Sequence, residues 1–193
     1  MGGGITYDSS SSEEWNESKS KAAFLTHSMP NFKIIETLRW AETEYWLLEE
    51  HLDRMCASAE YFEFQCNKLA ARQALDQMAP QFKGRSHRVR LLLAQDGSLE
   101  LDFSELDGMR FGQIRLATRT VLSNDRFLYH KTTHRKMYNE ELAAARIAHC
   151  DDALFFNERH ELTEGTIHNV FVVTNGVWRT PPVTCGVLRG KTF

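Results

Sequence analysis

One lysine stands among aromatic, hydroxyl and imidazole side chains in the stretch Leu128-Tyr129-His130-Lys131-Thr132-Thr133-His134-Arg135. The residues before it, 126–129, have the composition of a β-strand, and a helical pattern follows it. A lysine at a strand end that is partly withdrawn from water can lose its proton and attack an aldehyde. From this octet alone, a surface lysine at a strand–helix junction is the commoner interpretation, so other stretches must decide.

The composition is that of an ordinary soluble globular protein. Of the 193 residues, 42% are hydrophobic and 25% are charged, which favours one large domain or two small ones. A net charge of -3 lacks the excess of positive charge that is typical of nucleic-acid-binding proteins. No apolar run is long enough to cross a membrane. The start of the chain, Met1-Gly2-Gly3-Gly4, does not resemble a signal peptide. Four widely spaced cysteines favour reduced thiols over a zinc site: Cys56, Cys66, Cys150 and Cys185.

Residues 31–122 are expected to form a small α+β domain. The segment 32–40 alternates like a strand, and residues 46–62 and 67–78 have the pattern of helices. Strands are expected at 87–94, 98–103 and 113–119, with a hairpin turn at Asp96-Gly97. One antiparallel sheet flanked by two helices would account for the whole segment.

Three basic or hydroxyl side chains in this first part are candidates for a binding role. Thr37 and Arg39 share one face of the first strand, where they could meet a carboxylate or simply face solvent. Arg54 lies off the apolar stripe of the first helix, and a lone arginine there is usually solvated. Spacing alone therefore gives none of them a function.

Residues 123–193 are expected to begin a larger domain. A helix is predicted at 137–150, strands at 153–157 and 162–164, and a hairpin around Asn175-Gly176. After Pro181-Pro182, the glycine-containing stretch 185–193 could cradle a phosphate with backbone amides, which is a weak signal by itself.

Three stretches taken together resemble the class IV aminotransferases, which are the fold-type IV pyridoxal phosphate enzymes. They are the octet 128–135, Phe-Asn-Glu-Arg-His-Glu-Leu-Thr-Glu-Gly-Thr-Ile-His-Asn-Val-Phe at 156–171, and Thr-Pro-Pro-x-x-Cys-Gly-x-Leu-x-Gly at 180–190. Within the family, the set is most similar to the aminodeoxychorismate lyases that are fused behind aminodeoxychorismate synthase. The resemblance runs from about Asn31 to the last residue.

The resemblance implies a role for each matched residue. Lys131 matches the lysine that binds the cofactor covalently, and Glu164 the carboxylate that pairs with the pyridine nitrogen. Arg54 matches the arginine that holds the cofactor phosphate. Lys191 and Thr192 match the loop that adds donors to that phosphate. The positions lining the substrate side match Thr37, Arg39 and Arg90.

The implied reaction releases pyruvate from 4-amino-4-deoxychorismate and leaves 4-aminobenzoate for folate synthesis, in a cytoplasmic homodimer. Two alternatives remain open: an amino acid aminotransferase of the branched-chain or D-amino acid type, and a truncated non-catalytic member. The non-catalytic alternative arises because family members continue beyond the phosphate loop. Two further departures from the family pattern are His160, where glycine is common, and His168, where a small residue is common.

The first 30 residues are expected to be a separate N-terminal arm. Gly-Gly-Gly-Ile-x-x-Asp-Ser followed by Glu14-x-x-Glu17 resembles the C-terminal end of the chorismate-binding enzymes. In that family a glutamate matching Glu17 helps to hold magnesium. Because the rest of that large domain is absent, we expect a remnant without a chorismate or metal site.

Overall fold

The computed structural model describes residues 29–106 and 112–190. The chain divides into two compact units, Met1–Asn31 and Phe32–Phe193, and the described helices and strands belong to the second. The expectations for the N-terminal helix and for Glu17 lie outside the described residues. The proposed divisions at residues 30 and 122 stay predictions.

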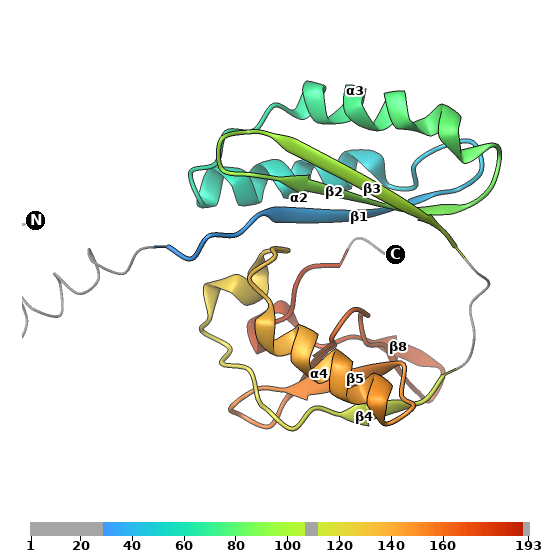
Figure 1. Cartoon of the computed structure of the whole chain (residues 1–193). Coiled ribbons are helices and arrows are strands. Elements are labelled where there is room, and N and C mark those ends of the chain that lie inside the picture. The colour runs from blue at the N-terminus through green and yellow to red at the C-terminus, as the bar shows by residue number, and fades with distance from the viewer. Residues whose placement is uncertain (1–28, 107–111, 191–193) are drawn as a thin grey trace, which may run out of the picture. The chain divides into compact units, whose positions relative to one another are not determined.

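The first sheet is antiparallel and has the order β1-β2-β3. Its strands are β1 (Ile34–Trp40), β2 (His87–Leu93) and β3 (Leu99–Glu105). Two helices, α2 (Leu48–Tyr61) and α3 (Lys68–Met78), lie together on one face of this sheet (Figure 1). A short 3-10 helix, Ala79–Phe82, links α3 to β2. These elements confirm the strands and helices expected between residues 32 and 105.

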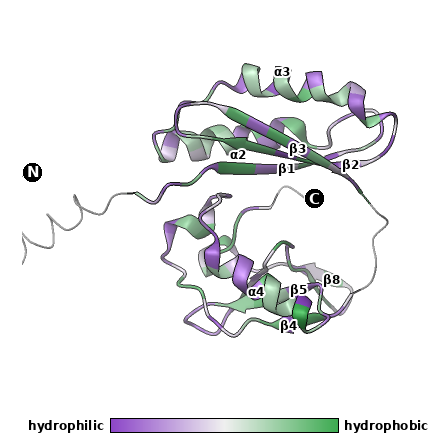
Figure 2. Cartoon of the chain, in the orientation of Figure 1, coloured by the Kyte–Doolittle hydropathy of each residue, from purple (hydrophilic) through white to green (hydrophobic). Residues whose placement is uncertain are grey.

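The main core lies between this sheet and its helices. Side chains of alternate residues on β1 and β2 meet the apolar stripe of α2, and Figure 2 shows the apolar colouring along β1. Complete burial of one such side chain stabilises the fold by roughly 1.5–3 kcal/mol. Fully buried members of this core include Ile34, Leu38, Leu52, Met55, Leu75, Val89 and Leu91.

The second sheet has the order β4-β5-β6 and contains a parallel pair. Its strands are β4 (Ile114–Leu116), β5 (Asp152–Phe156) and β6 (Leu162–Gly165). The helix α4 (Lys136–Ile147) lies between β4 and β5 in the chain. It supplies the crossover that a parallel pair requires. The expectation that residues 113–119 extend the first sheet was therefore wrong, because β4 pairs with β5 instead.

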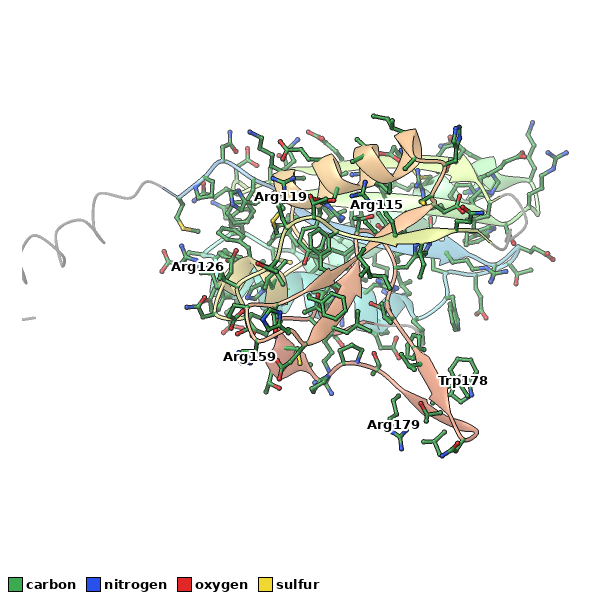
Figure 3. All side chains as sticks on the ribbon, turned by 90° about the horizontal axis from the view of Figure 1, so that it is seen from below. Arg115, Arg119, Arg126, Arg159, Trp178 and Arg179 are labelled. Carbon is green, nitrogen blue, oxygen red and sulfur yellow. The ribbon has the colours of Figure 1, made fainter. Side chains whose placement is uncertain are left out.

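A two-stranded hairpin follows, made of β7 (Val172–Thr174) and β8 (Val177–Arg179). Its turn residues Asn175 and Gly176 both have positive φ, as the predicted Asn-Gly turn requires. Trp178 and Arg179 lie on this hairpin, which extends away from the other elements in Figure 3. A 3-10 helix at Val183–Cys185 then leads into the last described residues.

Two of the cysteine thiols lie against each other. The sulfur atoms of Cys56, on α2, and Cys66, just before α3, are 2.8 Å apart. Treatment with diamide is expected to join them in a disulfide, with the two thiol hydrogens passing to the reagent. Burial and the neighbouring thiol raise the pKa of Cys66 to about 12, so the reaction should be faster in alkaline buffer.

Peptide mass mapping without reduction would identify the bond, and a Cys56→Ser chain is the matched control. A cross-link that prefers Cys150 or Cys185 would contradict this expectation.

Candidate active site

Lys131 follows a 3-10 helix, Arg126–Tyr129, and not the strand that the sequence suggested. The turn forms because the Asp125 carboxylate accepts a hydrogen bond from the Phe127 amide at 2.9 Å. Beyond it the chain runs extended beside β1. The Ile35 amide donates to the Lys131 carbonyl at 2.8 Å, and the backbone of Thr132 bridges to β1. The backbone of the lysine is therefore fixed to the edge of the first sheet.

The residue before the lysine is tied to α2. The Nδ1 atom of His130 lies 3.0 Å from the Ser58 hydroxyl. The His130 ring also stacks on Tyr61, with ring centroids 4.4 Å apart. These contacts restrict the direction in which the next side chain, that of Lys131, can point.

Lys131 and Glu164 line the same cavity, which has a volume of about 410 Å³. The cavity is built mainly from residues 125–140 and from the segment that begins with β6. Other polar side chains lining it include His130, His134, Arg135, Tyr138, His168 and Asn169. A hollow with a few convergent polar groups is the usual form of a small-molecule site.

Burial gives the cavity an unusual acid–base balance. Burial and the nearby Arg54 guanidinium lower the pKa of Lys131 from 10.5 to about 8. Burial raises the pKa of Glu164 to about 7, although Lys131 and Tyr138 pull that pKa downward. A substantial fraction of neutral amine is therefore present near pH 8, which is the form that attacks a carbonyl carbon.

Glu164 is held by a donor from α4. The Tyr138 hydroxyl donates to its Oε1 at 3.3 Å. The backbone at Leu188 also pulls the pKa of Glu164 downward. Sequence reasoning missed Tyr138. Its spacing of three residues from Arg135, on the helix that follows the lysine, was the available signal.

Arg135 is a second residue to which sequence reasoning gave no role. It lines the cavity, one of its terminal nitrogens donates to the Thr166 carbonyl, and its guanidinium lies 5.5 Å from the Tyr138 ring centroid. Its Nε is buried and has no hydrogen-bond partner within residues 29–106 and 112–190. A buried donor in that state is a candidate for binding an acceptor on a ligand.

The other predicted site residues that the structure describes do not line this cavity. Arg54 lies close enough to Lys131 to lower its pKa, and it donates to the Arg189 carbonyl at 2.9 Å. Thr37 and Arg90 are cross-strand neighbours on β1 and β2, and Arg39 shares their strand face. Lys191 and Thr192 lie outside the described residues.

The two unusual histidines differ in their surroundings. His160 is exposed in the β5–β6 turn at φ 60°, a left-handed conformation that explains why glycine suits the position. His168 lines the cavity, and its Nδ1 lies 2.7 Å from the buried carboxylate of Asp152. That hydrogen bond raises the pKa of His168, so a positively charged ring is favoured there.

A partly buried amine with a lowered pKa beside a carboxylate would suit a cofactor that has an aldehyde and a basic ring nitrogen. The amine would supply the covalent link, Glu164 could pair with the ring nitrogen, and the Arg54 guanidinium could meet a phosphate. Within the described part of the chain, no cluster of three acidic, histidine or cysteine side chains could bind a metal. No helix in that part has the length and apolarity to cross a membrane.

The comparisons with known proteins agree with this class of site. A family model described as amino-transferase class IV matches residues 33–192. The chain is 25% identical to a "Putative branched-chain-amino-acid aminotransferase" of Methanocaldococcus jannaschii, with 82% of this chain and 62% of that protein covered. It is 28% identical to a "Putative aminodeoxychorismate lyase" of Schizosaccharomyces pombe, with 84% of this chain and 71% of that protein covered.

A crystal structure of a "Putative amino-acid aminotransferase" from Mesorhizobium loti superposes with a TM-score of 0.76 at 31% identity, covering 82% of this chain and 78% of that one. The fold is thus that of the fold-type IV class, whose members depend on pyridoxal phosphate. The chain belongs to the class IV aminotransferase family. It spans less than two thirds of the Methanocaldococcus protein.

The lowered pKa of Lys131 predicts how the cofactor-free chain responds to pH. The native state binds this proton less tightly than the unfolded chain does, so the buried ammonium lowers stability below about pH 8. A Lys131→Met chain is therefore expected to melt a few degrees higher at pH 7. The advantage should fade as the pH rises from 8 to 10.5, where the unfolded chain also loses the proton.

Thermal melts of both chains across this pH range would measure the difference. A Lys136→Met chain, in which an exposed lysine is replaced, should show no such advantage. A Lys131→Met chain that is less stable than the wild type at pH 7 would contradict the expectation.

Proposed function

We propose that this chain carries out the lyase reaction that releases pyruvate from 4-amino-4-deoxychorismate and leaves 4-aminobenzoate, with pyridoxal phosphate as its cofactor. The observation that carries the proposal is the cavity that Lys131, a partly buried amine with a lowered pKa, shares with Glu164. The choice of lyase is supported by the similarity to the yeast protein and by the Thr-Thr-His-Arg and Thr-Pro-Pro stretches.

The bound cofactor supplies an electron sink that stabilises negative charge at the carbon next to the substrate nitrogen. Lys131 has two tasks in this scheme. Its Nζ would hold the cofactor and would also serve as the general base that accepts the proton from the substrate carbon. A pKa of about 8 suits both tasks, because an ordinary lysine would be almost fully protonated at neutral pH.

Glu164 keeps a proton on the ring nitrogen of the cofactor in this proposal. The Tyr138 hydroxyl orients its carboxylate. Arg135 and His168 line the cavity and could donate hydrogen bonds to a substrate with carboxylate groups. Thr37, Arg39 and Arg90 remain candidates for the substrate side, and Lys191 and Thr192 for the phosphate loop.

An amino acid aminotransferase is the second candidate function. The similarities to the Methanocaldococcus and Mesorhizobium proteins favour it, and the residues that hold the cofactor would be the same. The two reactions differ in their second substrate, because only transamination needs a 2-oxo acid to accept the amino group.

We further propose that the enzyme acts as a homodimer in the cytoplasm.

The deciding experiment has two stages. The purified chain is mixed with pyridoxal phosphate, its visible absorbance is recorded, and borohydride reduction is followed by peptide mass mapping. A visible band with the cofactor mass on the Lys131 peptide is the expected result. The loaded chain is then given aminodeoxychorismate alone, or an amino acid together with a 2-oxo acid.

Formation of 4-aminobenzoate and pyruvate without any 2-oxo acid would support the lyase. Amino-group transfer without 4-aminobenzoate would favour the transaminase. Absence of both the visible band and the adduct would reject the proposed cofactor chemistry for this chain.

A further inference from the structure

Glu36 is a charged residue on the face of β1 that packs against α2. Its neighbours on that face, Ile34 and Leu38, belong to the apolar core, and only 1% of the Glu36 side chain is exposed. Taking a carboxylate out of water costs free energy unless it is paired and hydrogen-bonded. A glutamate at this position therefore needs partners of its own, and α2 provides them.

Both partners of Glu36 come from α2 and lie one helical turn apart. Arg54 makes a two-pronged ion pair, with its Nε 2.8 Å from Oε1 and one terminal nitrogen 2.6 Å from Oε2. His51 Nδ1 lies 2.7 Å from Oε2. Burial alone would raise the pKa of Glu36, but the hydrogen bonds from Arg54 and His51 outweigh it and hold the pKa low.

The third side of the Arg54 guanidinium is fixed as well. Its other terminal nitrogen donates to the Arg189 carbonyl at 2.9 Å, next to the segment that contains Gly190. The planar group is thus tied to β1 through Glu36 and to the end of the described chain through Arg189. A guanidinium has five N–H bonds in a fixed plane, so these contacts set where its remaining N–H bonds point.

An arginine without these contacts would have many side-chain conformations and would lose that freedom on binding a ligand. Arg54 instead has its orientation set by the fold before any ligand arrives, which is how a binding group avoids an entropic cost. The ion pair also offsets the repulsion between Arg54 and the Lys131 ammonium, because Glu36 attracts that ammonium. The cofactor-free site therefore tolerates two cations close together.

We propose that Glu36, assisted by His51, is a positioning residue that holds Arg54 ready to bind the phosphate group of the cofactor. Glu36 itself does not touch the cofactor in this scheme. The proposal rests on the cofactor-binding part of the proposed function and is independent of whether the reaction is a lyase or a transaminase reaction.

The test compares two ligands that differ only by the phosphate group, pyridoxal phosphate and pyridoxal. Dissociation constants are measured by absorbance titration for the wild type, Glu36→Gln, His51→Asn and, as a matched control, Glu100→Gln. Glutamine keeps the size of Glu36 and one acceptor oxygen but removes the charge. Glu100 is a glutamate on the exposed face of β3, with 61% of its side chain accessible.

Glu36→Gln is expected to weaken pyridoxal phosphate binding about 10–100-fold, the range found when groups that orient the side chains of a metal site are removed. Pyridoxal binding should stay unchanged, because it offers no phosphate to Arg54. His51→Asn should weaken pyridoxal phosphate binding in the same direction but by less, since Arg54 keeps both of its bonds to Glu36. Glu100→Gln should bind both ligands as the wild type does.

An equal loss for both ligands would overturn the positioning role, because it would show a general effect on the fold. Unchanged pyridoxal phosphate binding in the Glu36→Gln and His51→Asn chains would also overturn it. If Glu36→Gln fails to fold, His51→Asn decides by the same comparison. A wild-type chain that does not bind pyridoxal phosphate would reject both proposals, whereas a Lys131 adduct with no selective loss would reject this one alone.

Discussion

A Lys131→Ala chain is expected to lose covalent attachment of pyridoxal phosphate and at least about a thousandfold of its turnover. A large loss is expected because, in the proposed mechanism, one amine would both hold the cofactor and move the proton. Among the residues lining the cavity, Lys136 is another primary amine, but 89% of its side chain is exposed, so it lacks the burial that lowers the pKa of Lys131. No other group would therefore be expected to take over both tasks.

The measurement is product formation together with mass analysis after borohydride reduction, with Lys68→Ala as the control at an exposed, ion-paired lysine. Adding a small primary amine should restore part of the turnover of Lys131→Ala, because the truncated side chain leaves room in the cavity for a replacement base. Near-normal turnover without added amine would refute the role of Lys131 in catalysis.

The parts of the fold that were predicted correctly are those in which one local pattern determines the structure. The 46–62 helix was visible because its apolar residues recur with helical spacing, and these residues are buried in α2. The turns at Asp96-Gly97 and Asn175-Gly176 were visible because few other sequences tolerate the positive φ angles that such turns need. In each case the residues of the segment itself were sufficient to predict its structure.

The errors arose in short segments whose composition fits more than one structure. Residues 113–119 look like any short strand, and only the crossover through α4 makes β4 pair parallel with β5. Residues 126–129 have the composition of a strand, yet the Asp125 side chain caps their first turn and a 3-10 helix forms. Composition in a short segment does not separate these outcomes.

The candidate site also contains residues that a sequence motif identifies and residues that only their contacts in the fold identify. Lys131, Glu164 and Arg54 stand in motifs that resemblance could match, and their roles stay proposals until they are tested. Glu36 and Tyr138 were missed because their importance comes from contacts with Arg54 and Glu164, which lie 18 and 26 residues away in the chain. A buried charge in an apolar strand face is a signal in hindsight, because such a charge requires a partner.

Replacing Glu164 with glutamine is expected to leave the cofactor attached to Lys131 but to lower turnover about 100- to 1,000-fold. Glutamine can still accept a hydrogen bond from the Tyr138 hydroxyl, so the shape of the cavity is preserved. It has no negative charge, however, and cannot keep a proton on the ring nitrogen by charge pairing. The loss should appear mainly in kcat, because the electron demand is greatest in the transition state.

The cofactor-free Glu164→Gln chain should respond in the opposite direction. The pKa of Glu164 is raised to about 7 by burial, so the native carboxylate binds its proton more tightly than the unfolded one. The ionised Glu164 carboxylate therefore does not lower the free energy of unfolding at pH 4, and it lowers it fully above pH 7. At pH 9 the variant should melt above the wild type, and at pH 4 the two should agree.

This pairing of lower turnover with higher stability separates a chemical role from a folding defect, since misfolding would lower both. Glu100→Gln, at an exposed glutamate, is the matched control and should change neither quantity. Wild-type turnover in Glu164→Gln would remove this carboxylate from the mechanism. A variant that is less stable than the wild type at pH 9 would show that Glu164 holds the fold together, in which case its pairing with Tyr138 would be structural.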